Sequence, residues 1–262
     1  MIYIFLFIFG TIIGSFLNVL GLRYNSGLGI EGRSMCLTCG ETLKWHELIP
    51  VVSYFFRLGR CRSCRSPIAF QYPAVELFTG FVFVYAYRAL LPGAFDARFL
   101  ILFILLAATF CVYIVIAIYD LRHKIIPDSL VYPAIVLAGA FSAVAHRPVS
   151  DWLAGVFIFL FFFTIWFISK GKAMGFGDAK LGLSIGFLLG LVRGLSALAF
   201  AFWVGTAVAL ALMMLSKTYP LFKAGKKLTI KSEIPFAPFL VFGAWLALIF
   251  HADLFHLSSF IK

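Results

Sequence analysis

Two aspartates, Asp120 and Asp178, stand at the edges of apolar stretches of this chain. Asp120 ends the apolar run 99–119, and Asp178 follows directly on the triplet Gly175-Phe176-Gly177. A carboxylate at the border of a bilayer is costly to keep ionised, so it is usually retained for pairing or for chemistry. Two neighbouring carboxyl groups share a proton, so one can take a proton from water while the other gives one to a carbonyl oxygen. The two aspartates therefore predict an acid–base pair that hydrolyses an amide bond.

The residues around the aspartates have more than one interpretation. Gly175 and Gly177 let the backbone bend and let an extended substrate strand come close without a side chain in the way. Lys180 could instead be an ion-pair partner of Asp178 and give that aspartate a structural role. Asp128 falls in the expected first turn of a helix, where a carboxylate is favoured by free N–H groups, and capping is its preferred interpretation.

Four cysteines form two C-x-x-C pairs, Cys36 with Cys39 and Cys61 with Cys64, with 21 residues between the pairs. Such pairs can surround a zinc ion with four thiolates at about 2.3 Å, and Gly40 supplies the tight turn that the first pair needs. Disulfides and a redox-active pair are the alternatives. A cytoplasmic location disfavours stable disulfides, and a redox pair needs no second copy. Because four protein ligands leave no open position, the predicted role of zinc is to fold this segment.

The composition places these residues in a membrane protein. The chain of 262 residues is 63% hydrophobic and 13% charged, with a mean hydropathy of +1.02, which exceeds the apolar content of soluble domains. The first apolar run lacks a basic start and a small-residue cleavage site, so we expect it to remain as a helix. The sequence predicts an all-α polytopic membrane protein with about eight transmembrane helices. They are expected at 1–22, 74–91, 99–119, 129–145, 152–169, 179–193, 195–216 and 235–250.

The predicted domains follow from where polar residues gather. Residues 1–22 form the first transmembrane helix, and residues 23–73 are the one long polar stretch, with four of the five cysteines. About fifty residues form only a small hydrophobic core, so this inserted cytoplasmic domain needs additional stabilisation, such as a bound zinc ion. Residues 74–262 form the membrane aspartyl protease domain, with about seven helices and a basic loop at 217–234.

The distribution of charge predicts the orientation in the membrane. The net charge is +11, and 17 of the 22 Lys and Arg residues fall in the segments 23–73, 120–128, 170–180 and 217–234. With an outside N-terminus, these segments all lie on the cytoplasmic side, as the positive-inside rule requires. The zinc domain and both aspartates are then cytoplasmic. Attraction to anionic lipids explains the basic face, and no nucleic-acid partner is expected.

Further short motifs occur in a fixed order along the chain and carry a resemblance to a known family. The chain resembles the type IV prepilin peptidases, which are bacterial membrane aspartyl proteases with a Gly-x-Gly-Asp motif. Each motif is weak alone, whereas their order is specific. They are Gly14-Ser15-Phe16-Leu17-Asn18-Val19, the two C-x-x-C pairs, Pro50, Gln71-Tyr72-Pro73-Ala74-Val75-Glu76, Asp120 with Ile126-Pro127-Asp128, Gly175-Phe176-Gly177-Asp178-Ala179-Lys180-Leu181, and Ile234-Pro235-Phe236-Ala237-Pro238-Phe239.

The resemblance implies a function for these residues. Asp120 and Asp178 would be the catalytic pair of an endopeptidase of the bacterial inner membrane. The substrate would be the leader peptide of a type IV prepilin or a pseudopilin of a pilus or type II secretion system, cut at the cytoplasmic face. The resemblance also implies N-methylation of the new N-terminus with S-adenosylmethionine, an activity tied to residues 23–73. The residues locate no site for that cofactor, because the chain lacks a glycine-rich nucleotide loop.

Two alternatives stay open. Glu76, at the start of the second predicted span, could face the positively charged leader or the new amine, or could be a first-turn residue favoured by the helix dipole. Asp120 and Asp178 could be the proton sites of a proton-coupled membrane carrier instead of a protease. Carriers place such carboxylates near the bilayer midplane, whereas both aspartates fall at the predicted cytoplasmic edge, which favours the protease.

Overall fold

The computed structural model of the chain describes residues 1–27, 29, 32–36, 38–91, 96–218, 235–250 and 253–254, with the backbone alone at 215–218. Within these residues the secondary structure is helical, apart from two isolated β-bridges. The chain divides into two compact units, residues 1–118 and residues 119–262. The boundary falls inside the long helix α4 (Ala97–His123), so that its last turn belongs to the second unit.

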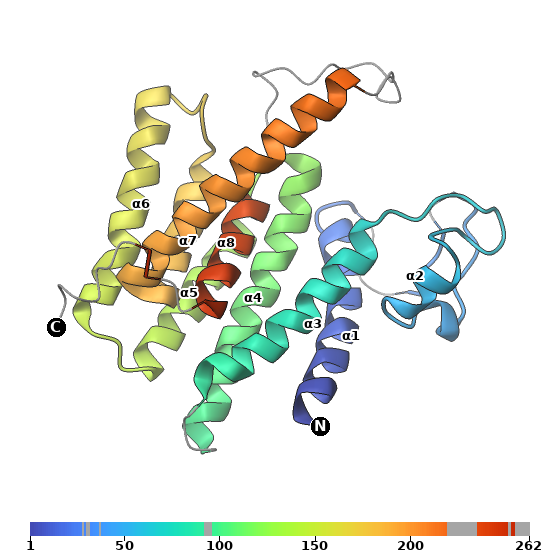
Figure 1. Cartoon of the computed structure of the whole chain (residues 1–262), viewed down its shortest axis with the longest axis horizontal. Coiled ribbons are helices and arrows are strands. Elements are labelled where there is room, and N and C mark those ends of the chain that lie inside the picture. Colours follow the sequence, from blue (N-terminus) through green and yellow to red (C-terminus); the bar gives the residue numbers. More distant parts are fainter. Residues whose placement is uncertain are drawn as a thin grey trace. The chain divides into compact units, whose positions relative to one another are not determined.

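The first unit contains α1 (Ile2–Arg23), the short 3-10 helix η1 (Trp45–Glu47), α2 (Val52–Phe56), α3 (Gln71–Leu90) and most of α4. Helices α1 and α3 lie side by side (Figure 1) because small residues let their backbones approach. A Cβ atom at Gly10 would lie 2.8 Å from the Cα atom of Gly80, and one at Gly14 would lie 2.8 Å from the Cα atom of Glu76. Close packing of this kind is typical of helix pairs in membranes.

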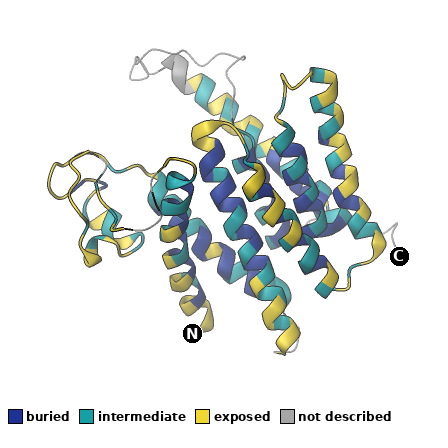
Figure 2. Ribbon diagram, turned by 180° about the vertical axis from the view of Figure 1, so that it is seen from behind, coloured by how far each residue is buried: buried dark blue, intermediate teal, exposed yellow. Residues whose placement is uncertain are grey.

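Residues 24–70, between α1 and α3, form a small module with little regular structure. Figure 2 shows that most of this module is exposed or half-exposed, whereas the long helices carry stripes of buried residues. The predicted domain 23–73 therefore includes this module and the first residues of α3.

The second unit contains the end of α4, α5 (Asp128–Val144), α6 (Val149–Ser169), α7 (Phe176–Thr218) and α8 (Ala237–Ile249). Helix α7 packs against α5, α6 and α8. Glycines make the closest contacts: Gly155 of α6 meets Gly186 of α7, and Gly243 of α8 meets Ala201 of α7. Helix α7 is thus the central element of this unit, and it carries Asp178 in its first turn.

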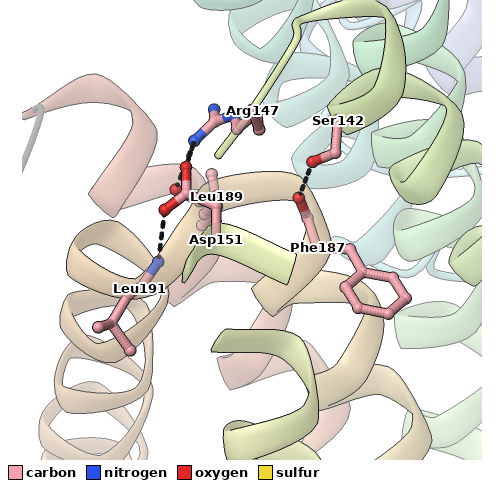
Figure 3. A network of polar contacts seen from close by, with 6 residues as sticks. All are labelled: Ser142, Arg147, Asp151, Phe187, Leu189 and Leu191. Carbon is pink, nitrogen blue, oxygen red and sulfur yellow. Dashed lines mark hydrogen bonds and ion pairs between the residues drawn. The ribbon is translucent and has the colours of Figure 1, made fainter. Parts of the chain in front are cut away.

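Helix α7 is broken at Gly190, whose φ of 76° and ψ of −174° are accessible to glycine alone. Residues of α6 and of the connection just before it satisfy the backbone groups that the break frees (Figure 3). Arg147 donates to the carbonyl oxygen of Leu189 at 3.1 Å, and Asp151 accepts from the N–H of Leu191 at 3.4 Å. Arg147 and Asp151 also form an ion pair at 3.1 Å. Such partners are needed because a break in a helix leaves backbone groups without their usual partners.

Each of the eight predicted segments falls on a helix, and the last two before α8, 179–193 and 195–216, both lie within α7. The predicted interruption at Arg193 and Gly194 is wrong by a few residues, because the break lies at Gly190. By length and composition, four helices among the described residues could cross a membrane: α1, α4, α6 and the part of α7 from Phe176 to Met214. The basic loop 217–234 lies outside the described residues, apart from the backbone of its first two positions.

Candidate functional site

Asp120 lies in the last turn of α4 and is 4% exposed. Negative charge is disfavoured at the C-terminal end of a helix, and a buried carboxylate needs a hydrogen-bond donor. That donor is the backbone N–H of Ala237, the first residue of α8, which lies 3.1 Å from Oδ2 of Asp120. Sequence reasoning missed Ala237 as a partner, because a backbone group 117 positions away leaves no sign in the residue types.

Asp178 lies in the first turn of α7 and is 8% exposed. Its own N–H donates to the carbonyl oxygen of Gly175 at 3.2 Å, which closes this turn. A Cβ atom at Gly175 would lie 3.5 Å from Oδ2 of Asp178 and would meet only atoms of Asp178 and Gly177 within 4 Å. Gly175 is also exposed, so the side of the carboxyl group that it borders is open.

Gly177 has different surroundings. A Cβ atom there would lie 2.6 Å from the Cβ atom of Ile126, which belongs to the short connection between α4 and α5. The position therefore needs glycine because α7 packs tightly on this connection. Of the two glycines predicted to leave room for a substrate, Gly175 borders open space and Gly177 does not.

The second unit brings the two predicted aspartates together. Their carboxyl groups lie close enough to interact electrostatically, although one comes from the end of α4 and the other from the start of α7. Both side chains are buried. Two buried carboxyl groups that interact electrostatically can share one proton, and aspartic proteases use such a pair to activate water.

Lys180 pairs with Asp128 rather than with Asp178. Its Nζ atom lies 2.6 Å from Oδ1 of Asp128 and 3.3 Å from the hydroxyl oxygen of Tyr132, and it stands over the ring of Phe176. Asp128 is the first residue of α5 and so lies in the first turn, as predicted. This ion pair connects the start of α7 to the start of α5, so the interpretation of Lys180 as the partner of Asp178 is not supported by the geometry.

Glu76 is buried within the first unit. Its Oε2 atom accepts the N–H of Val51 at 2.7 Å, and its carboxyl group also has a hydrogen bond with the side chain of Ser15. Val51 has a φ of 63° and a ψ of −53°, and the next residue, Val52, donates to the carbonyl oxygen of Pro50 at 2.5 Å. This is a γ-turn of the strained type, and Glu76 holds it. Glu76 lies beyond the first turn of α3, so its interpretation as a first-turn residue favoured by the helix dipole is wrong. The geometry instead gives it a different structural role, in which it joins the module to α3.

The four cysteines of the module come together as the sequence predicts. Their sulfur atoms all lie within 4.8 Å of one another, with Cys36 to Cys64 at 3.8 Å and Cys39 to Cys61 at 4.0 Å. Four sulfur atoms bound tetrahedrally at about 2.3 Å from one zinc ion would lie ~3.8 Å apart. These distances are too long for disulfides, which join sulfur atoms at about 2.05 Å. The cluster therefore fits a closed four-thiolate metal centre.

The two C-x-x-C segments fold as a matched pair of turns. In the first turn, the N–H of Cys36 donates to Glu41 at 2.9 Å and Gly40 donates back to Cys36 at 2.9 Å. The second turn repeats the pattern one cysteine pair later: the N–H of Cys61 donates to Ser66 at 2.9 Å and that of Arg65 donates to Cys61 at 3.1 Å. Gly40 and Arg65, at the same place in each turn, both have positive φ. The tight turn predicted at Gly40 is confirmed.

The thiols of this cluster do not all ionise equally. The backbone N–H of Cys39 contributes most to lowering the pKa of Cys36 to about 5, and the side chain of Ser66 contributes most to lowering the pKa of Cys64. The Glu41 backbone lowers the pKa of Cys39, but lost hydration and the neighbouring thiols raise it overall to about 12. Adjacent thiolates repel one another, so four of them require a cation between them.

Comparisons with known proteins identify the family of the chain. Residues 8–90 match the family described as Bacterial Peptidase A24 N-terminal domain, and residues 105–210 match the Type IV leader peptidase family. Three relatives are named prepilin leader peptidase/N-methyltransferase. The relative from Bacillus subtilis is 32% identical over 98% of this chain and 97% of its own length. The relative from Aeromonas hydrophila is 27% identical over 97% and 93%, and that from Klebsiella pneumoniae is 32% identical over 71% and 84%.

The apolar helices and the match to a leader peptidase family model place the chain in the class of membrane peptidases. The chain belongs to the type IV leader peptidase family. No solved structure gives a significant match to the chain.

Proposed function

We propose that this chain is a membrane aspartyl endopeptidase that removes the leader peptide of type IV prepilins or pseudopilins, with Asp120 and Asp178 as its catalytic pair. The observation that carries the proposal is the meeting of two buried carboxyl groups from the end of α4 and the start of α7. The relatives named prepilin leader peptidase/N-methyltransferase support the choice of substrate.

The pair acts on a water molecule and on the scissile amide. The ionised carboxyl group takes a proton from water as the water oxygen attacks the carbonyl carbon. The protonated carboxyl group gives its proton to the carbonyl oxygen, which becomes the hydroxyl of a tetrahedral intermediate. When the C–N bond breaks, the first carboxyl group gives the proton it took from water to the leaving nitrogen, which becomes the new N-terminal amine. The hydroxyl of the intermediate returns its proton to the second carboxyl group as the carbonyl reforms. No covalent intermediate forms. Gly175 leaves the approach to Asp178 open, and the ion pair of Lys180 with Asp128 connects the start of α7 to the start of α5.

The chain spans the bacterial inner membrane eight times, with α7 counted as two helices on either side of Gly190. The N-terminus lies outside, and the module, both aspartates and the basic segment 217–234 lie on the cytoplasmic side. The excess of Lys and Arg in the predicted cytoplasmic segments supports this orientation. The same residues attract anionic lipids, which are a partner of the cytoplasmic face.

Zinc, held by the four cysteines, would fold the predicted domain of residues 23–73, which includes the module. It would take no part in hydrolysis, because its four ligands are all supplied by the protein. The remaining residues, 74–262, form the protease domain. The names of the relatives also support N-methylation of the new N-terminus. If bound, S-adenosylmethionine would supply the methyl group for the new amine and would leave as S-adenosylhomocysteine.

A proton-coupled carrier is the less favoured function. Both aspartates lie at helix ends, Asp120 in the last turn of α4 and Asp178 in the first turn of α7. A carrier more often places its carboxylates in the middle of its helices, near the bilayer midplane. A metal-folded module also has no task in such a carrier.

The test is cleavage of a prepilin by the purified chain in liposomes, with the products identified by mass spectrometry. We expect one cut that releases the leader and, when S-adenosylmethionine is present, a mature product heavier by one methyl group in place of a hydrogen. A chain that carries protons across the liposome membrane and leaves the prepilin whole would contradict the proposal. Cleavage without methylation would contradict the proposed methyltransferase activity and support the peptidase activity.

A further inference from the structure

Helix α8 begins in an unusual way, and its first backbone N–H group has a specific partner. The first N–H groups of a helix have no partner within the helix. In α8, Pro238 has no N–H at all, while Phe239 and Leu240 donate to the carbonyl oxygen of Phe236 at 3.0 and 3.1 Å. The one donor left over in this first turn is the N–H of Ala237, and it points at Asp120.

The contact is enclosed and geometrically fixed. Ala237 is fully buried and Asp120 is 4% exposed, so water does not compete for the hydrogen bond. The ring of Phe236, just before the helix, packs against Phe162 of α6 and Phe202 of α7 with ring centroids 6.2 and 5.1 Å away. The start of α8 therefore cannot move freely relative to the rest of the unit, and its N–H holds the carboxyl group in one orientation.

Helix α8 also packs along α7, the helix that carries Asp178. Gly243 of α8 lies against Ala197 and Ala201 of α7, a contact that only glycine permits. One helix therefore contacts both halves of the catalytic pair: its first N–H binds Asp120, and its flank binds the helix of Asp178. The relative position of the two carboxyl groups depends on α8.

We propose that the backbone N–H of Ala237 is the positioning group of the catalytic pair, and that it occupies Oδ2 of Asp120 so that Oδ1 is the oxygen that takes the proton from water. The inference rests on the proposed function, in which Asp120 and Asp178 hydrolyse the leader peptide. It assigns a task to the segment Pro235–Pro238, in which Pro238 takes no part as a donor and the N–H of Ala237 binds the carboxyl group.

The test replaces Ala237 by lactic acid, its α-hydroxy analogue, which is incorporated during translation by suppression of a stop codon. The amide bond between Phe236 and position 237 then becomes an ester. The resulting ester keeps the side chain and the backbone path and removes only the N–H group. We expect kcat for prepilin cleavage in liposomes to fall about 10- to 100-fold, as for a lost hydrogen bond to a charged group, with KM within about twofold. The matched control is the ester at Phe239, which removes an N–H of the same helix turn that does not reach Asp120. Its kcat should stay within about threefold.

Equal losses of kcat for the two esters would show that the N–H of Ala237 has only a structural role, which would overturn the proposal. An unchanged kcat for the Ala237 ester would also overturn it. Ala237→Pro removes the same N–H by a second route, since proline is favoured at the first position of a helix, and Ala237→Gly keeps the N–H. If an ester fails to fold, this second pair decides: the proposal requires the proline variant to lose kcat and the glycine variant to keep it. Full activity of Asp120→Asn would instead refute the proposed function itself, so the two failures are distinguishable.

Discussion

The tetracysteine module and the aspartate pair are assembled over very different distances in the chain. All four sulfur ligands lie between residues 36 and 64, and the turns that present them close within a few residues of each cysteine. The aspartate pair draws on the ends of three helices, and its hydrogen bond to Ala237 joins residues 117 positions apart. A local site of this kind can be held by a metal ion, whereas a site built from distant helix ends depends on helix packing. The two regions should therefore fail under different perturbations.

The largest expected effect is that of removing the metal ion, which should unfold the module and leave the second unit folded. Binding of a structural zinc ion contributes about 10–16 kcal/mol to the folding of a small domain. We predict that Cys61→Ser, or strong chelation, opens residues 24–70 to trypsin while the second unit stays resistant. Limited proteolysis with mass spectrometry measures both regions in one sample, and Cys111→Ser is the matched control because Cys111 lies outside the cluster. A module that stays protected without metal would contradict the account.

The aspartate site should instead respond to packing. Gly177→Ala would place a Cβ atom 2.6 Å from that of Ile126, whereas Gly175→Ala would make only an ordinary contact at 3.5 Å. Overpacking costs about 1–3 kcal/mol, so we expect Gly177→Ala to lower prepilin cleavage about tenfold or more. Gly175→Ala should change it by less than about threefold. The reverse order of the two glycines would show that Gly175, and not Gly177, is the constrained position.

A smaller effect is expected at the break in α7, far along the helix from Asp178. Asp151→Ala leaves the N–H of Leu191 and the guanidinium of Arg147 without this acceptor. Loss of such a partner costs about 1–3 kcal/mol, while Asp151→Asn keeps one acceptor oxygen and should cost less. Denaturant unfolding in detergent measures the difference. Equal stability of the wild type and Asp151→Ala would show that Asp151 does not stabilise the break in α7.

The smallest effect concerns Glu76, which connects the module to α3. Glu76→Gln keeps an oxygen that can accept the N–H of Val51, so its cost should be below about 1 kcal/mol. Cleavage and substrate affinity should stay unchanged. Glu76→Leu leaves that N–H unpaired and should destabilise the first unit by about 1–3 kcal/mol. If Glu76→Gln alone weakened substrate binding, Glu76 would face the leader or the new amine, as the alternative interpretation holds.

The same contrast explains what the sequence could predict. The cysteine cluster and its turn at Gly40 were predictable because spacing fixes local geometry. The helices were predictable from apolar runs, and both aspartates from their place at the ends of those runs. The break in α7 was misplaced because Arg193 and Gly194 are the more conspicuous interruption in the sequence. The φ of Gly190 and its partners Arg147 and Asp151 are visible only in the fold.

Contacts between distant residues were the ones that sequence reasoning missed. Lys180 stands two residues after Asp178, yet its partner is Asp128, 52 positions away. The surroundings of Gly177 depend on Ile126, and those of Asp120 depend on a backbone N–H of α8. In each case the residue types are compatible with several partners, and the packing of helices selects one.

The central claim is that Asp120 and Asp178 together carry out hydrolysis. The most direct measurement is the rate of prepilin cleavage in liposomes by Asp120→Asn and by Asp178→Asn, with folding and zinc content checked for each. Asp128→Asn is the matched control, because that carboxylate is exposed and contacts Lys180 rather than the pair. We predict that each substitution within the pair lowers kcat by about 10²- to 10⁴-fold or more, and that the control stays within about threefold. Cleavage at close to the wild-type rate by either variant of the pair would contradict the account.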